Sequence, residues 1–230
     1  MKYEAVIFDL FGTLVNNIPY SEQRKLFVEV GTILKAPGEE VFRLWSDIWE
    51  LRGNGFFQST RETLDYICNK LEISAPDTKL EYAVQMHCDY IERQVIPYAN
   101  ALGVLTRLKS EGYKTGLITD CSAGTVNHWE KIPLSHLIDA PVFSCSERVM
   151  KPNARIYLLV SERLGVEPQN CLYIGDGGSQ ELTGAAEVGM HPVLIRHPDE
   201  VSSEIYYERE EWNGPVISSL KEVIDLVNKV

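Results

Sequence analysis

The fold is decided by the stretch Ala5-Val6-Ile7-Phe8-Asp9-Leu10-Phe11-Gly12-Thr13-Leu14 near the start of the chain. An apolar run that ends in a turn is typical of a strand buried in a parallel sheet, so residues 5–8 are expected to form one. Asp9 closes the run at the carboxyl end of this strand, where open α/β sheets bind their ligands. A carboxylate is rarely buried without a partner. Asp9 is therefore a candidate reacting group, with a simple turn cap as the alternative interpretation.

The composition is that of an ordinary globular protein. The chain has 230 residues, 44% hydrophobic and 24% charged, which suffices for one large domain or for a core with an insertion. The formal net charge is −11 and no segment gathers lysines and arginines, which argues against nucleic acid as a partner. The five cysteines are scattered and indicate free thiols rather than disulfides or a zinc site. His87, His128 and His136 lack metal-ligand spacing and are expected at the surface or half-buried.

Neither end of the chain nor any interior segment indicates a membrane protein. The first residues do not resemble a signal peptide. No apolar run approaches the length of a membrane-spanning helix. We therefore expect a cytoplasmic protein that does not bind membranes; the sequence makes no prediction of its oligomeric state.

The residue pattern changes twice along the chain. From about Tyr20 to Ile96 the apolar residues follow helical spacing, and Ser59 with Glu62 forms a capping box. Beyond Pro97, short apolar strands alternate with helices. The predicted strands are 114–119, 141–143, 171–174 and 192–195, and the predicted helices are 101–111, 122–131, 153–164, 181–188 and 220–227. The acidic segment 198–215 is predicted to be a solvated loop.

Alternating strands and helices predict βαβ units and a parallel sheet that is covered on both faces. We therefore predict an α/β protein with a doubly wound parallel sheet and an inserted α-helical cap domain. The core is predicted to comprise residues 1–15 and 97–230. The cap is predicted to comprise residues 16–96.

Polar side chains stand where the predicted strands end or the following helices begin. They are Asp9, Thr119, Asp120, Lys151, Asp176 and Glu181. In a doubly wound sheet these positions meet at one rim. A carboxylate there can act as a covalent nucleophile, and two or three carboxylates can supply the oxygen ligands that magnesium prefers. Lys151 supplies a local cation for an anionic substrate, and the Thr119 hydroxyl can bind phosphate oxygens together with N–H groups at the next helix mouth.

As an ordered set, these segments resemble the haloacid dehalogenase (HAD) superfamily, in the subgroup with a helical cap after the first motif. The stretch 8–14 resembles the first motif of that family and 117–120 the second. Lys151-Pro152 resembles the third motif, and Gly175-Asp176 with Glu181 resembles the fourth. The resemblance covers essentially the whole chain and implies a Rossmann-like core.

The resemblance also implies roles for individual residues. Asp9 would be the nucleophile, Thr119 and Lys151 would orient a phosphoryl group, and Asp176 would bind magnesium. The metal would be held by Asp9, the backbone carbonyl of Phe11, Asp176 and Glu181, where Glu181 stands in place of the usual aspartate. Asp120 and, from the cap, Arg52 are predicted to bind substrate. Further cap candidates are Tyr20, Arg24, Phe56 and Phe57.

Phe11 departs from the pattern of the phosphatases in this family. They carry at this position a second acid, which protonates the leaving group and then activates water. Phenylalanine cannot transfer a proton, so a contribution of about 10²–10⁴-fold is missing or comes from another group. The 2-haloacid dehalogenases of the family carry an aromatic residue there, normally tyrosine, and need no metal. Their fourth motif, however, lacks the Gly-Asp pattern found at Gly175-Asp176.

The sequence therefore predicts a magnesium-dependent phosphatase that acts on a small phosphorylated metabolite through an aspartyl-phosphate on Asp9. One alternative is a metal-independent hydrolase similar to the 2-haloacid dehalogenases. The other is a catalytically weak protein that binds an anion or a protein partner. Phe11 is the reason that both alternatives stay open.

Overall fold

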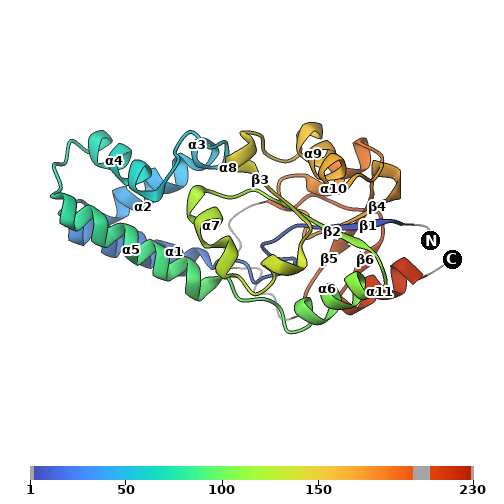
Figure 1. The fold of residues 1–230 in the computed structure, drawn as a ribbon. Coiled ribbons are helices and arrows are strands. Elements are labelled where there is room, and N and C mark those ends of the chain that lie inside the picture. The colour runs from blue at the N-terminus through green and yellow to red at the C-terminus, as the bar shows by residue number, and fades with distance from the viewer. Residues whose placement is uncertain (1–2, 199–207, 229–230) are drawn as a thin grey trace.

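The computed structural model describes residues 3–198 and 208–228 (Figure 1). In this part of the chain, six strands form one parallel sheet in the order β3-β2-β1-β4-β5-β6. The strands are β1 (Ala5–Phe8), β2 (Lys114–Thr119), β3 (Ala140–Phe143), β4 (Cys171–Gly175), β5 (His191–Ile195) and β6 (Val216–Ile217). The first strand is central, because Ala5 pairs with Lys114 of β2 on one side and with Cys171 of β4 on the other.

Helices cover both faces of the sheet (Figure 1). One face is covered by α6 (Ala101–Ser110) and α11 (Lys221–Asn228), the other by α9 (Ala154–Leu164) and α10 (Glu181–Glu187). Alternate residues of β1 belong to the two resulting cores: Val6 and Phe8 face one, Ala5 and Ile7 the other. All four side chains are fully buried, as expected of a central parallel strand. The predicted doubly wound α/β fold is confirmed.

Five helices lie between β1 and α6. They are α1 (Tyr20–Leu34), α2 (Gly38–Asp47), α3 (Trp49–Gly53), α4 (Thr60–Lys70) and α5 (Asp77–Gln94). The predicted capping box starts α4: Ser59 Oγ accepts the N–H of Glu62 at 3.1 Å, and the Glu62 carboxylate accepts the N–H of Gln58 at 2.7 Å. These helices lie beyond the carboxyl end of β1 (Figure 1), where a cap over the rim is expected.

Several short elements were not predicted. They are β6, α8 (Ser144–Glu147) and three 3₁₀ turns, and they are too short to show a period in the sequence. The predicted helix 122–131 ends earlier, because α7 (Ala123–His128) passes into a 3₁₀ turn at Trp129–Lys131. In the acidic segment, residues 199–207 lie outside the described part of the chain, and the remainder forms no helix. No helix in the described ranges is both long and apolar enough to cross a membrane.

The prediction that the histidines lie at or near the surface is wrong for two of them. His87 on α5 is only 3% exposed, and its Nδ1 lies 3.2 Å from Thr60 Oγ1. His128 on α7 is also buried, with Nδ1 3.0 Å from the carbonyl oxygen of Gly124. Each ring has a polar partner, which allows a histidine to stay buried. His136 is exposed, as expected.

Candidate active site

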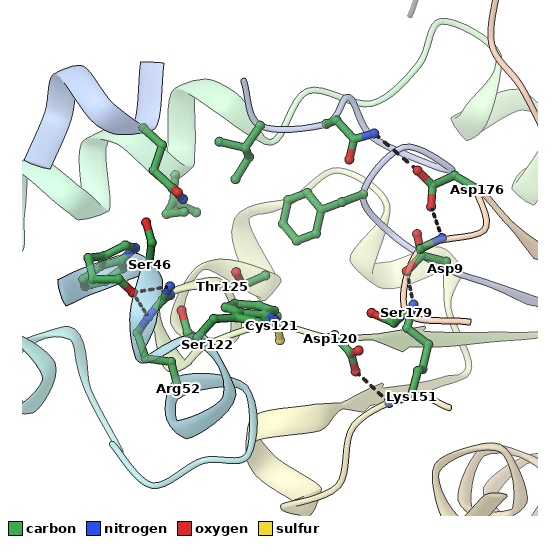
Figure 2. A pocket seen from close by; sticks show the side chains of 18 of the residues that line it. Asp9, Ser46, Arg52, Asp120, Cys121, Ser122, Thr125, Lys151, Asp176 and Ser179 are labelled. Carbon is green, nitrogen blue, oxygen red and sulfur yellow. Dashed lines mark hydrogen bonds and ion pairs between the residues drawn. The ribbon is translucent and has the colours of Figure 1, made fainter. Parts of the chain in front are cut away.

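Most of the predicted site residues meet at the carboxyl ends of β1, β2 and β4 (Figure 2). Asp9 follows β1 directly, and its peptide N–H donates to the carbonyl oxygen of Ile174 at 2.9 Å, so the pairing with β4 continues to the candidate nucleophile. The Asp9 side chain is buried, and its Oδ1 lies 2.7 Å from Lys151 Nζ. Burial raises the pKa of Asp9 to about 6; Lys151 opposes this rise and the Asp176 carboxylate adds to it.

Lys151 bridges two carboxylates. Its Nζ donates to Asp9 Oδ1 at 2.7 Å and to Glu181 Oε2 at 2.6 Å. Glu181 Oε2 also accepts the hydroxyl of Tyr173 at 2.8 Å, and Oε1 accepts the N–H of Gly177 at 2.9 Å. Burial alone would lower the pKa of Lys151, but Asp9 and Glu181 outweigh it and raise that pKa well above its usual value. The lysine therefore stays charged, and Glu181 is placed to orient it.

Asp176 lies beside Asp9 and is bonded at both oxygens (Figure 2). Its Oδ1 accepts the N–H of Gly178 at 3.1 Å. Its Oδ2 accepts Nη2 of Arg209 at 2.7 Å and Nδ2 of Asn17 at 3.4 Å. The acid that the resemblance assigned to a metal thus forms an ion pair with an arginine.

Two glycines in the predicted motifs leave room for these acids. Gly12 has a φ of +79°, and a Cβ there would lie 2.4 Å from Asp176 Oδ2. A Cβ on Gly175 would lie 2.3 Å from Glu181 Oε1. Real Cβ atoms do not come so close to another atom. Any side chain at either position would therefore displace a carboxylate from the site.

Thr119 and Asp120 end β2 close to Lys151. Thr119 is fully buried, and its Oγ1 has no hydrogen-bond partner within the described ranges. Buried hydroxyls without a partner are unusual, and this one is suited to a bound oxyanion. Asp120 lines the cavity and accepts the peptide N–H of Lys151 at 3.1 Å, so it fixes the lysine backbone. Burial raises the pKa of Asp120, and Lys151 opposes this rise.

A cavity of about 400 Å³ lies over this cluster, between the core and the inserted helices (Figure 2). Asp9, Lys151 and Asp176 line it from the core, while Trp45 and Arg52 line it from α2 and α3. Its volume is in the usual range for small-molecule sites. The inserted helices therefore complete the walls of a site whose charged groups come from the core.

Arg52 is the predicted cap residue that reaches this cavity. It is 4% exposed, and Nε and Nη2 donate to the carbonyl oxygen of Trp45 at 3.2 and 3.0 Å. Its guanidinium carbon lies 4.0 Å from the Trp45 ring centre and 5.0 Å from that of Trp49. These contacts hold a buried positive charge in the wall. The other cap candidates do not line the cavity: Tyr20, Arg24, Phe56 and Phe57.

His87 is a cavity residue that the sequence analysis missed. Burial, together with the charges of Arg52 and His128, lowers its pKa to about 3. The ring is therefore neutral at physiological pH. The sequence showed only that His87 lies on the apolar face of the helix α5. A single histidine on such a face is most often a core residue, so this position did not predict a cavity residue.

Phe11 lines the same cavity and is half-buried. The carboxylates of the described residues that line this cavity are Asp9, Asp120 and Asp176. Asp120 and Asp176 already accept hydrogen bonds from the protein. His87 is neutral and weakly basic, and none of these groups stands at the position of the acid that Phe11 lacks, although Asp120 Oδ2 has no hydrogen-bond partner within the described ranges.

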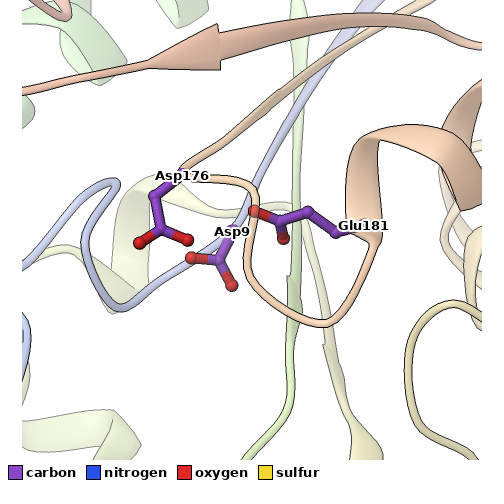
Figure 3. A group of neighbouring side chains, drawn as sticks. All are labelled: Asp9, Asp176 and Glu181. Atoms are coloured by element: carbon purple, nitrogen blue, oxygen red, sulfur yellow. The ribbon is translucent and has the colours of Figure 1, made fainter. Parts of the chain in front are cut away.

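The carboxylates of Asp9, Asp176 and Glu181 each offer an oxygen within 4.8 Å of the others (Figure 3). Hard oxygen donors of this kind suit Mg²⁺. Both oxygens of Glu181 are engaged by protein donors, and so are both oxygens of Asp176, so a metal ion would have to displace a donor at either acid. The three carboxylates thus fit a divalent cation if the ion pair between Asp176 and Arg209 breaks.

Comparisons with known proteins find similar sequences and similar folds. A model of the haloacid dehalogenase-like hydrolases matches residues 3–189. The chain is 26% identical to a glyceraldehyde 3-phosphate phosphatase of Methanopyrus kandleri, over 84% of each protein. It is also 26% identical to an (S)-2-haloacid dehalogenase of Pseudomonas fluorescens, over 88% of each. Among solved structures, a HAD phosphatase from Thermococcus onnurineus aligns with a TM-score of 0.70 and 22% identity, over 98% of each chain.

Proposed function

Because the chain belongs to the haloacid dehalogenase-like hydrolases, we propose that it is a phosphatase of a small phosphorylated metabolite, with Asp9 as its nucleophile. The observation that carries the proposal is the placement of Asp9 beside Lys151 and Asp176 in the wall of the cavity. The relatives named as phosphatases of glyceraldehyde 3-phosphate support this substrate class.

The proposed reaction has two steps. An Asp9 oxygen attacks phosphorus while the bond to the leaving oxygen breaks, and water then hydrolyses the aspartyl-phosphate to phosphate and free carboxylate. The Lys151 ammonium and the Thr119 hydroxyl bind the phosphoryl oxygens and balance their charge. Asp9, Asp176 and the Phe11 carbonyl would hold Mg²⁺, which supplies further charge neutralisation when bound.

The leaving group should limit this enzyme. Phe11 cannot protonate a departing oxygen, and no other lining acid of the described residues stands at this position. General acid catalysis contributes about 10²–10⁴-fold, and the loss is greatest for basic leaving groups. We therefore expect faster hydrolysis of aryl and acyl phosphates than of alkyl phosphates.

The inserted helices are proposed to act as the cap that selects the substrate. We place this cap at residues 16–96, with the core at 1–15 and 97–230. Arg52 is proposed to bind a negative or polar group of the substrate at the end of the cavity formed by the cap. Closure of such a segment excludes water from the reacting atoms.

A 2-haloacid dehalogenase-like reaction is the second candidate, and Phe11 favours it. A halide leaves without a proton, so the missing acid carries no cost in that reaction. The nucleophile is again Asp9, which would displace halide from carbon and form an ester that water hydrolyses. The third candidate is a catalytically weak protein that binds an anion or a protein partner, and such a protein has no turnover for Asp9→Asn to remove.

Hydrolysis of p-nitrophenyl phosphate with and without Mg²⁺ tests the proposal, beside halide release from 2-chloropropionate. Asp9→Asn is compared with Asp47→Asn, which makes the same change at an exposed acid on α2. Phosphatase activity that Asp9→Asn abolishes and Asp47→Asn preserves would support the proposal. Halide release dependent on Asp9 would favour the second candidate. Turnover of neither substrate by the folded protein would favour the third.

A further inference from the structure

Arg209 is a half-buried cation beside the fourth motif, and the proposed mechanism does not use it. Its Nη2 lies 2.7 Å from Asp176 Oδ2, and its side chain is only 16% exposed. Asp176 is the acid proposed above as a metal ligand. The guanidinium therefore lies against one of the two oxygens that Asp176 could offer to a divalent cation.

Backbone and side-chain hydrogen bonds of residues 209–210 hold Arg209 beside Asp176. Arg209 forms an antiparallel bridge with Gly178, and the next N–H, that of Glu210, donates to the carbonyl oxygen of Gly177 at 2.9 Å. The Glu210 carboxylate then accepts the N–H groups of Leu182 and Thr183 in the first turn of α10, at 2.6 and 3.1 Å. These bonds tie residues 209–210 to the same loop that carries Asp176. The position of Arg209 beside Asp176 is therefore fixed by the hydrogen bonds of its own segment.

The number of charged groups in the site indicates what Arg209 does there. Among the described residues, the buried carboxylates of Asp9, Asp176 and Glu181 are paired with two cations, Lys151 and Arg209. Lys151 is shared between Asp9 and Glu181, which leaves Arg209 as the cation on Asp176. A metal ion placed on Asp176 would bring a second positive charge against the guanidinium. The two cations cannot both hold the same carboxylate oxygen at low cost.

We propose that the Arg209 guanidinium is an internal cation that competes with Mg²⁺ for the Asp176 carboxylate. The inference rests on the proposed function only in taking Mg²⁺ as the competing ion. When no metal ion is bound, the Arg209 guanidinium balances the charge of the Asp176 carboxylate. Metal binding requires that Arg209 moves off Oδ2, so the apparent affinity for Mg²⁺ is lowered by the energy of that ion pair.

Calorimetric titration of the metal-free protein with MgCl₂ tests the proposal without an activity assay. Arg209→Gln removes the positive charge. Arg209→Lys keeps a positive charge but lacks the planar set of N–H donors of a guanidinium group. We expect Arg209→Gln to bind Mg²⁺ at least about tenfold more tightly than the unaltered chain, because hydrogen bonds to charged groups are worth that much in a binding constant. Arg209→Lys should fall between the two. Arg163→Gln, which breaks an ion pair with Glu147 away from the site, should leave the affinity unchanged.

Adding Asp176→Asn to Arg209→Gln should abolish the gain, which would place the tighter binding at this carboxylate. Thermal melts of each metal-free variant confirm that it is folded. The proposal is overturned if folded Arg209→Gln and the unaltered chain bind Mg²⁺ equally, or if neither binds it. If Arg209→Gln and the unaltered chain both bind Mg²⁺ tightly and equally, the proposal that the protein is a phosphatase is unaffected. Metal-independent hydrolysis of p-nitrophenyl phosphate by a chain that binds no Mg²⁺ would reject only the role of the metal.

Discussion

Lys151→Met should destabilise the folded protein strongly, because Lys151 is the cation shared by two buried carboxylates. Its Nζ lies 2.7 Å from Asp9 and 2.6 Å from Glu181. At an effective dielectric constant near 20, each contact corresponds to about 6 kcal/mol of attraction, much of which offsets the cost of burying the charges. Removal of one partner of a buried ion pair typically costs 3–5 kcal/mol. We expect a loss of about 3–5 kcal/mol in the free energy of unfolding at pH 8.

The loss should shrink at low pH. Burial raises the pKa of Asp9 to about 6, and it raises that of Glu181 as well, so the folded state takes up protons more readily than the unfolded chain. Without Lys151 both values rise further. A carboxyl group whose pKa is higher in the folded state than in the unfolded chain destabilises the folded state at high pH. This destabilisation disappears as the pH falls below the pKa of the group in the unfolded chain, which is near 4. The difference between Lys151→Met and the unaltered chain should therefore be larger at pH 8 than at pH 5.

Urea unfolding of four proteins measures the coupling: the unaltered chain, Lys151→Met, Glu181→Gln and the double variant. Glutamine keeps the volume of Glu181 but removes its charge, so the double variant should lose less than the sum of the single losses, by at least about 1 kcal/mol. Lys109→Met is the control, because Lys109 pairs with Asp139 at a more exposed site, where a loss of only about 0–1 kcal/mol is expected. A loss in Lys151→Met no larger than in this control, or independent of pH, would refute the argument.

Three further predictions concern the cavity and its walls. Phe11→Asp should raise the hydrolysis rate of an alkyl phosphate relative to p-nitrophenyl phosphate by about 10²-fold or more, and Phe11→Asn should not; equal ratios in both variants would contradict the role given to this position. The pKa of His87 is lowered to about 3, so the unfolded chain gains a proton first as pH falls below about 6.5, and stability falls by up to about 1.4 kcal/mol per pH unit. Urea unfolding between pH 4.5 and 7 should show a smaller pH slope for His87→Gln, and an unchanged slope would count against a neutral buried ring. Gly12→Ala combines a positive φ with a close approach to Asp176, so it should lower stability by more than about 1 kcal/mol and also reduce turnover; a thermal melt matching that of the unaltered chain would argue against the crowding described here.

Much of the core could be predicted because its strands are apolar runs that end in polar residues. The first strand lies where the apolar run before Asp9 predicted it, and Asp9 follows it as expected. Lys151, Asp176 and Glu181 come together with Asp9 because parallel strands bring their carboxyl ends to one rim. Sequence order alone was enough for this part of the site.

The remaining contacts of the site depend on tertiary packing. Arg209 belongs to an acidic segment that was predicted to be a solvated loop, and nothing in its neighbours signals a contact with Asp176. His87 lies among apolar residues at helical spacing, which predicts burial but not a cavity wall. The engagement of both Glu181 oxygens also depends on Tyr173 and Gly177, whose roles become visible only once the loop is folded.

The central position of β1 affects the order in which a growing chain can assemble its site. The strand that carries Asp9 is the first to be synthesised, but its sheet partners begin only at Lys114 and Cys171. The helices α1–α5 make contacts close in sequence, and such structures form quickly, so they are expected to fold while β1 still waits for a neighbour. Lys151 emerges between these two partner strands, and Glu181 emerges after both. The residue proposed to react is thus made before the strands that pair with β1, and it acquires its charge partners Lys151 and Glu181 only after more than a hundred further residues have been added.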